Sequence, residues 1–143
     1  MKMTTSPVVE LDIFVPGVPR PQGSKRHIGG GRMVESSKYV KSWRQAVALK
    51  ARHYRKRQPP LTGPLWLRVE FIMPARKREP DPGGWHIVKP DVDKLLRAIC
   101  DAVTDIVIAD DCLLVDVHVR KRRARLSEKP GARIIITRAT ETP

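Results

Sequence analysis

The amino-acid sequence predicts one small α+β domain, in which two main helices pack on a mixed β-sheet. Two patterns of apolar residues lead to this prediction. Alternation of apolar and polar residues is typical of strands, whereas apolar residues at i, i+3, i+4 and i+7 are typical of helices. These patterns occur in the order β-α-β-α-β-β, at about residues 8–15, 36–57, 65–73, 91–105, 113–119 and 132–138. A chain of 143 residues fits a single domain over residues 1–143, and we expect residues 1–7 and 139–143 to be frayed.

The first strand and the first helix each have a predicted apolar face. Apolar residues occupy every second position of the strand, at Val9, Leu11, Ile13 and Val15. Ser36 or Ser37 is a candidate N-cap for the helix, and Gln58-Pro59-Pro60 stops it. The predicted inner face of this helix consists of Val40, Trp43, Val47, Ala51 and Tyr54. Its outer face is basic, and either follows DNA phosphates or is simply solvated.

The later elements follow the same two patterns. The second strand alternates at Leu67, Val69 and Phe71. The central helix has one predicted buried face, formed by Val92, Leu95, Leu96, Ile99 and Val103. The third strand places its apolar residues on one face, at Leu113, Val115, Val117 and Val119. A cluster of basic residues follows this strand, and a turn at residues 127–131 leads into the last strand.

The stretch from Lys89 to Asp111 gathers carboxylates in an otherwise basic chain. Asp91 and Asp93 begin the central helix, where negative charge is favoured. A second pair, Asp110-Asp111, comes about twenty residues later, just before a strand. The whole chain has 28 Lys and Arg against 15 Asp and Glu, a net charge of +13. Acids that converge in such a basic protein indicate a site for a hard cation beside a polyanion.

Each of these acids also has an ordinary structural interpretation. Asp91 is a good N-cap, and Asp93 is a first-turn charge that can lie beside Arg97 one turn further on. The Asp110-Asp111 pair is compatible with a turn before a strand. These interpretations leave a second class of function open, a basic nucleic-acid-binding protein without chemistry.

The joint arrangement of acids resembles the RusA family of Holliday-junction resolvases. That family has roughly an Asp-x-Asp-Asn at a helix start, a Lys four residues after the second Asp, an Asp-Ala-Leu and then an Asp-Asp before a strand. The corresponding segments here are Asp91-Val92-Asp93, Asp101-Ala102-Val103 and Asp110-Asp111. Two positions differ, since Lys94 stands where the family usually has Asn and Arg97 where its catalytic Lys falls. The order of elements over most of the chain is similar as well.

The resemblance implies a RusA-like fold and a Mg²⁺-dependent endodeoxyribonuclease, active as a homodimer, that resolves Holliday junctions by paired symmetric nicks in DNA recombination and repair. It implies Asp91, Asp93 and Asp111 as catalytic metal ligands, with Asp110 in or just behind this set. Mn²⁺ is expected to substitute for Mg²⁺. Either Lys94 or Arg97 takes the role of the family's lysine. An arginine does not give up its proton in proteins, so Lys94 is the candidate proton donor and Arg97 the candidate phosphate ligand.

Two basic loops are candidate contacts for a four-way DNA junction, the expected partner. The Pro- and Gly-rich loop after the first strand contains Arg20, Lys25, Arg26 and Arg32. The loop before the central helix contains Arg76, Lys77 and Arg78. RusA-like proteins have a similar basic loop after the first strand, near the DNA. The alternative is that both loops are solvated connections.

The sequence disfavours several other classes of site and location. Cys100 and Cys112 form no C-x-x-C pair, and the four histidines are scattered. Gly-rich phosphate loops, Ser-His-Asp sets and H-E-x-x-H motifs are missing from the sequence. It contains neither a run of eighteen apolar residues nor a secretory signal pattern. We therefore expect a cytoplasmic protein that makes no contact with membranes.

Overall fold

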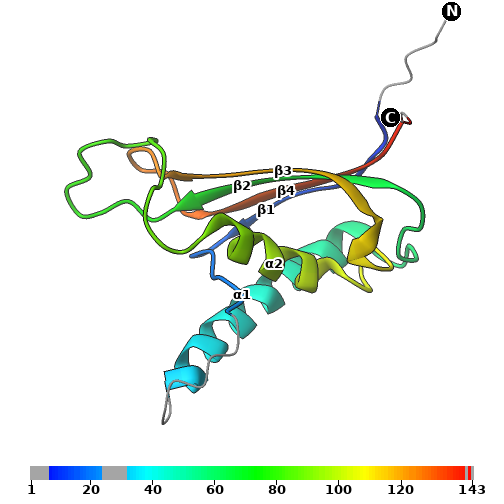
Figure 1. Cartoon of the computed structure of the whole chain (residues 1–143), viewed down its shortest axis with the longest axis horizontal. Coiled ribbons are helices and arrows are strands. Elements are labelled where there is room, and N and C mark those ends of the chain that lie inside the picture. Colours follow the sequence, from blue (N-terminus) through cyan, green and yellow to red (C-terminus); the bar gives the residue numbers. More distant parts are fainter. Residues whose placement is uncertain (1–6, 24–31, 141, 143) are drawn as a thin grey trace, which may run out of the picture.

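The computed structural model describes residues 7–23, 32–140 and 142, and its elements follow the predicted order. The elements are β1 (Val9–Pro16), α1 (Arg32–Arg55), β2 (Leu65–Met73), α2 (Val92–Val103), η1 (a 3-10 turn, Asp111–Leu113), β3 (Leu114–Arg123) and β4 (Gly131–Arg138). The strands form one mixed sheet, and both helices lie on the same side of it (Figure 1). The predicted α+β domain is confirmed. Neither of these helices is long and apolar enough to cross a membrane.

The sheet has the strand order β1-β4-β2-β3, so β1 and β3 are its edges. β4 pairs antiparallel with both β1 and β2, whereas β3 pairs parallel with β2. A parallel pair needs a crossover connection, because the chain must return to the same end of the sheet. Residues 74–113 form this crossover, which consists of a long loop, α2 and η1.

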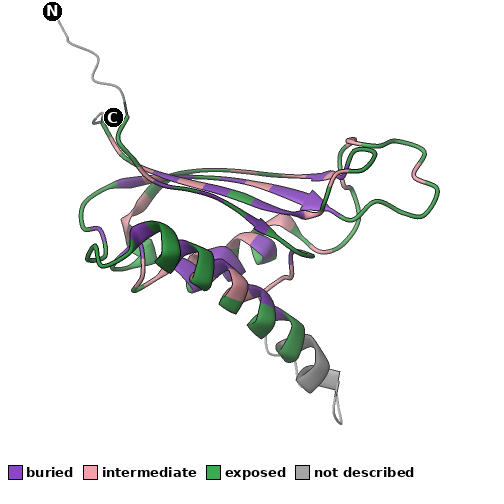
Figure 2. Cartoon of the chain, turned by 180° about the vertical axis from the view of Figure 1, so that it is seen from behind, coloured by how far each residue is buried: buried purple, intermediate pink, exposed green. Residues whose placement is uncertain are grey.

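The core lies between the helices and one face of the sheet (Figure 2). β2 is the central contributor, since its inward side chains Leu65, Leu67, Val69 and Phe71 are at most 2% exposed. α2 covers them with a buried stripe at the spacing expected of an amphipathic helix, formed by Leu95, Ala98, Ile99, Ala102 and Val103. Because this stripe points at the sheet, the opposite side of α2 faces outward with its polar residues.

The first helix differs from the prediction at both ends. It begins at Arg32, before the predicted caps, and ends at Arg55. Tyr54, predicted on the inner face, is 41% exposed, whereas Arg55 is only 3% exposed. Arg55 takes the inward position because it has partners there. It donates hydrogen bonds to a carboxylate oxygen of Glu10 at 2.7 Å and to the carbonyl oxygen of Pro59 at 2.8 Å.

The third strand is longer than predicted and less buried. It continues through the basic cluster to Arg123 instead of ending at Val119. Val115 and Val117 are 62% and 40% exposed, because β3 is an edge strand. The extension follows from pairing with β2, whose residues up to Met73 all have partners on β3.

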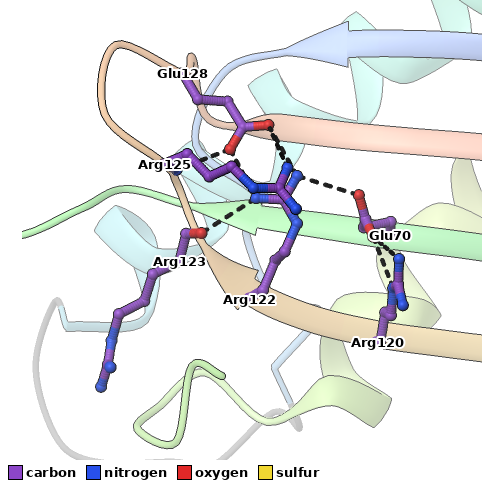
Figure 3. A network of polar contacts seen from close by, with 6 residues as sticks. All are labelled: Glu70, Arg120, Arg122, Arg123, Arg125 and Glu128. Carbon is purple, nitrogen blue, oxygen red and sulfur yellow. Dashed lines mark hydrogen bonds and ion pairs between the residues drawn. The ribbon is translucent and has the colours of Figure 1, made fainter. Parts of the chain in front are cut away.

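An ion-pair network holds the end of β3 against β2 and the following turn (Figure 3). Arg122, only 6% exposed, donates to the two carboxylate oxygens of Glu128 at 2.7 and 2.8 Å and to Glu70 at 3.3 Å. Arg120 donates to the other oxygen of Glu70 at 2.6 Å. The hydrogen bonds from Arg122 lower the pKa of Glu128 to about 2. The basic cluster after the predicted strand is therefore partly structural.

Candidate active site

A small open pocket lies on the outward face of α2. Its volume is about 320 Å³, and it is lined by Gln22, Asp93, Lys94, Leu96, Arg97, Cys100 and Asp111. Asp93, Arg97 and Cys100 follow each other at helical spacing on the side of α2 opposite its buried stripe. The stretch from Asp93 to Cys100 covers about 10 Å of the helix axis. The pocket thus places acidic, basic and thiol groups along two turns of one helix.

Asp111 enters this pocket from the turn before β3. It is the first residue of η1, and the preceding Asp110 is the N-cap of that turn. The Asp110 carboxylate accepts a hydrogen bond from the Cys112 amide at 2.9 Å, and this bond lowers the pKa of Asp110. Burial and the negative charge of Asp111 raise the pKa of the Cys100 thiol to about 11. Cys100 and Asp111 line the same pocket, which is consistent with this effect.

Asp91 lies at the start of α2 but outside the residues that line the pocket. It is the N-cap by its backbone, since its carbonyl oxygen accepts the Leu95 amide at 3.1 Å. Its carboxylate makes no capping hydrogen bond and instead lies 3.7 Å from the ammonium nitrogen of Lys94. Both side chains of this pair are about half exposed. The carboxylate of Asp91 is therefore not used to cap the helix, and its partner is the Lys94 ammonium.

Two predicted metal ligands, Asp93 and Asp111, line the same pocket. Mg²⁺ is usually bound through one or two carboxylates, with water and substrate phosphate completing its shell. A cluster of three or more Asp, Glu, His or Cys residues able to enclose a metal does not occur within residues 7–23, 32–140 and 142. The donor set thus fits an open cation site with two carboxylates better than a closed cage. The pocket brings together Asp93, Asp111, Arg97 and Lys94, but not Asp91 or Asp110.

Gln22 belongs to the pocket, although nothing in the sequence singled it out. The backbone N–H of Gln22 donates to the Lys94 carbonyl oxygen at 3.0 Å, so the segment after β1 lies against the first turn of α2. Arg44 of α1 donates to the side-chain oxygen of Gln22 at 2.9 Å and lies 3.9 Å from Asp101 of α2. Gln22 is therefore fixed by both helices, and its side-chain amide lies in the pocket with Asp93 and Asp111.

Lys121 holds the segment that leads into Asp91. Its ammonium nitrogen donates to the carbonyl oxygens of Val88 and Pro90 at 2.6 and 2.7 Å. The backbone of this segment also pairs with the free edge of β3, where the Arg123 amide donates to the Gly84 carbonyl oxygen at 2.8 Å. The start of α2 is thus tied to the sheet by a lysine of β3, which belongs to the basic cluster that follows the predicted third strand in the sequence.

The first basic loop is only partly described. The guanidinium of Arg20 lies 4.9 Å from the centre of the Tyr39 ring, in a cation–π contact. Lys25 and Arg26 lie outside the described residues. Arg32 is the first residue of α1, and its side chain is likewise outside what the structure describes.

The second basic loop projects beyond the end of the sheet (Figure 1). Arg76, Lys77 and Arg78 are all exposed. Arg76 lies 3.5 Å from a carboxylate oxygen of Glu79, so part of its charge is neutralised locally. The loop runs into the segment held by Lys121, which connects it directly to the start of α2.

Comparison with known proteins identifies the class to which this fold and pocket belong. The family model described as "Endodeoxyribonuclease RusA" matches residues 15–137. The uncharacterized protein YqaN of Bacillus subtilis (strain 168) is 32% identical over 127 residues, covering 82% of this chain and 85% of YqaN. The match includes both helices, the pocket, all of β2 and β3 and nearly all of β4, but only the last two residues of β1. The protein is thus of the endodeoxyribonuclease class. The chain belongs to the RusA family, as the spacing of its acids predicted.

Replacement of Lys121 tests whether it fixes the start of α2. Lys121→Met keeps the apolar stem but removes the two hydrogen bonds to Val88 and Pro90, each worth about 1.5–3 kcal/mol for a charged donor. We expect faster hydrogen exchange of the amides in residues 84–91 and faster trypsin cleavage in the loop at residues 76–78. Lys129→Met, at an exposed position in the turn after β3, is the matched control and should change neither. Unchanged exchange in Lys121→Met would show that the segment is held by other contacts.

Proposed function

We propose that this chain is a Mg²⁺-dependent endodeoxyribonuclease that resolves four-way DNA junctions. The main support is that Asp93 and Asp111 line one pocket together with Arg97, in a member of an endodeoxyribonuclease family. The net charge of +13 favours a polyanionic substrate. The choice of a four-way junction rests on the RusA family resemblance.

The roles of the acids follow from what phosphodiester hydrolysis requires. Asp93 and Asp111 would hold the cation, and Asp91 would join them after separating from Lys94. Mg²⁺ or Mn²⁺ at this position would supply activation of a water and neutralisation of the charge on the departing oxygen. Without a cation, clustered carboxylates repel each other and the DNA phosphate alike. A cation held by these carboxylates would remove both obstacles.

The two basic residues of the pocket, Lys94 and Arg97, would have different roles. Arg97 lies one turn after Asp93 on the same face of α2, where its planar guanidinium suits two oxygens of the scissile phosphate. Lys94 lies beside Asp91 and is the group able to donate a proton to the leaving oxygen. Gln22 is oriented by Arg44 and can donate its side-chain amide hydrogens to a phosphate.

Asp110 acts on the site through Asp111. Its carboxylate is engaged by the Cys112 amide, which keeps η1 folded and so sets the direction of the neighbouring Asp111 side chain. We therefore place Asp110 beside the ligand set as a positioning residue. Its removal should disturb the site less than removal of a ligand.

Asparagine substitutions separate these roles. Asp91→Asn, Asp93→Asn and Asp111→Asn should each lower the rate of junction cleavage by at least about 100-fold, and Asp110→Asn by about 10-fold, the range for residues that orient ligands. Junction binding should stay equal or become tighter, because each change removes negative charge near phosphate. Cleavage is followed on gels with a labelled synthetic junction, and binding by fluorescence anisotropy in EDTA.

The matched control is Asp81→Asn, an exposed carboxylate in the loop after β2 and outside the pocket, which should cleave at the wild-type rate. A wild-type rate in any of the three ligand variants would remove that residue from the proposed set. Loss of binding together with cleavage would show that the acid is needed for the fold or for DNA contact instead.

We further propose that the chain acts as a two-fold homodimer. Resolution of a four-way junction into two ligatable duplexes needs two symmetric nicks, and one pocket suits one phosphate at a time. A two-fold dimer matches the symmetry of the junction. The uncovered sheet face supports a partner, because it presents Trp66 and Ile135 among charged side chains instead of a fully polar surface.

Paired nicking is tested with a supercoiled plasmid that extrudes a cruciform. A dimer that makes both nicks within one bound complex should convert the plasmid directly to linear product. Separate encounters by a monomer should first accumulate nicked circles. A monomer in sedimentation at the assay concentration, with nicked circles as the lasting product, would rule out the dimer.

A further inference from the structure

A long groove runs between α1 and the C-terminal half of α2, apart from the pocket of Asp93 and Asp111. Its volume is about 1150 Å³, and it extends from Lys41 on α1 to the Pro59-Pro60 segment and Asp105. α1 and α2 contact each other on the same side of the sheet (Figures 1 and 2). The described residues of the two basic loops considered above do not line this groove.

The groove is strongly positive on its α1 side. Five basic and two acidic side chains line it, a net charge of +3. The basic residues are Lys41, Arg44, Arg52, Lys56 and Arg57, and all but the half-buried Arg44 are exposed. One of the two acids, Asp101, is already close to Arg44 at 3.9 Å. Most of the positive charge is therefore available to an external anion.

The groove is physically connected to the pocket of Asp93 and Asp111. Arg44 lines the groove and at the same time donates a hydrogen bond to Gln22, which lines the pocket. On α2, Cys100 faces the pocket and the next residue, Asp101, faces the groove. A polyanion that occupied the pocket could therefore continue along α1 without leaving a positive surface.

We propose that this groove binds the phosphate backbone of a duplex arm of the DNA substrate. This inference rests on the proposed function and extends it, because it assigns the arm to the α1 groove. The distance from Lys41 to the end of α1 at Arg55 is about 21 Å at the helical rise per residue, and Lys56 follows directly. Phosphates of one strand are spaced by about 3.4 Å along a duplex, so the groove matches roughly six base pairs of one arm.

The test compares two double variants of α1 in the full-length protein. Lys41→Ala with Arg52→Ala removes two charges from the groove. Lys38→Ala with Lys50→Ala removes two charges from exposed positions of the same helix outside the groove, and is the matched control. Junction binding is measured by anisotropy in EDTA over a range of salt, and circular dichroism checks that both variants fold.

The groove variant should bind the junction about 10-fold more weakly, with a slope of log K against log salt that is about 2 units shallower. The control variant should stay within about 2-fold of wild type with an unchanged slope. A wild-type slope in the groove variant overturns the proposal. Equal losses in both variants overturn it too, because they would reflect net charge and not the groove.

A second measurement locates the contact on the DNA. Junction arms with uncharged methylphosphonate linkages over the six base pairs next to the crossover should weaken binding of wild-type protein but have little further effect on the groove variant. Equal weakening of both proteins would place the contact elsewhere and overturn the proposal. The protein could bind linear duplex as tightly as junctions, and the groove variant could bind both more weakly by the same factor. That result would overturn the proposed preference for junctions but support the groove as a contact for duplex DNA.

Discussion

The parallel pairing of β2 with β3 is the constraint on which the site depends. It forces a crossover between these strands, and the crossover contains α2 and the turn that holds Asp111. Because α2 must bury Leu95 and Ile99 against the sheet, Asp93 and Arg97 are directed outward. The return of the chain into β3 then brings Asp111 alongside the same helix face. Acids separated by eighteen residues meet because of topology and amphipathicity together.

Charges in this molecule fall into two groups with different surroundings. Arg55 and Arg122 are buried, and each is held by carboxylates at close distance, as burial of a charge requires. By contrast, Asp93 is exposed, and among the described residues it has no ion-pair or hydrogen-bond partner. The buried, paired arginines fix the sheet and its edges, whereas the Asp93 carboxylate lines an open pocket.

Periodicity in the sequence predicted the order of elements, the outward position of the acids of α2 and three residues of its buried stripe, because periodicity reports burial. Val92 and Leu96, also predicted in that stripe, are only half-buried, and the small residues Ala98 and Ala102 occupy buried positions instead. It could not predict that Gln22 and Lys121 reach the start of α2, since those contacts depend on the path of loops in three dimensions. The burial of Arg55 in place of Tyr54 has a similar cause. A charged residue is placed inward only when a distant partner, here Glu10, is present to receive it.

Metal-dependent nicking of a synthetic four-way junction is the most direct measurement of whether these carboxylates perform chemistry. The wild-type protein would be incubated with a labelled junction and with linear duplex of the same sequence, in Mg²⁺ and in EDTA. We expect nicks near the crossover in Mg²⁺ only, and little cleavage of the duplex. Tight binding of the junction without cleavage in Mg²⁺ or Mn²⁺ would contradict the proposed nuclease site and leave a non-catalytic DNA-binding protein.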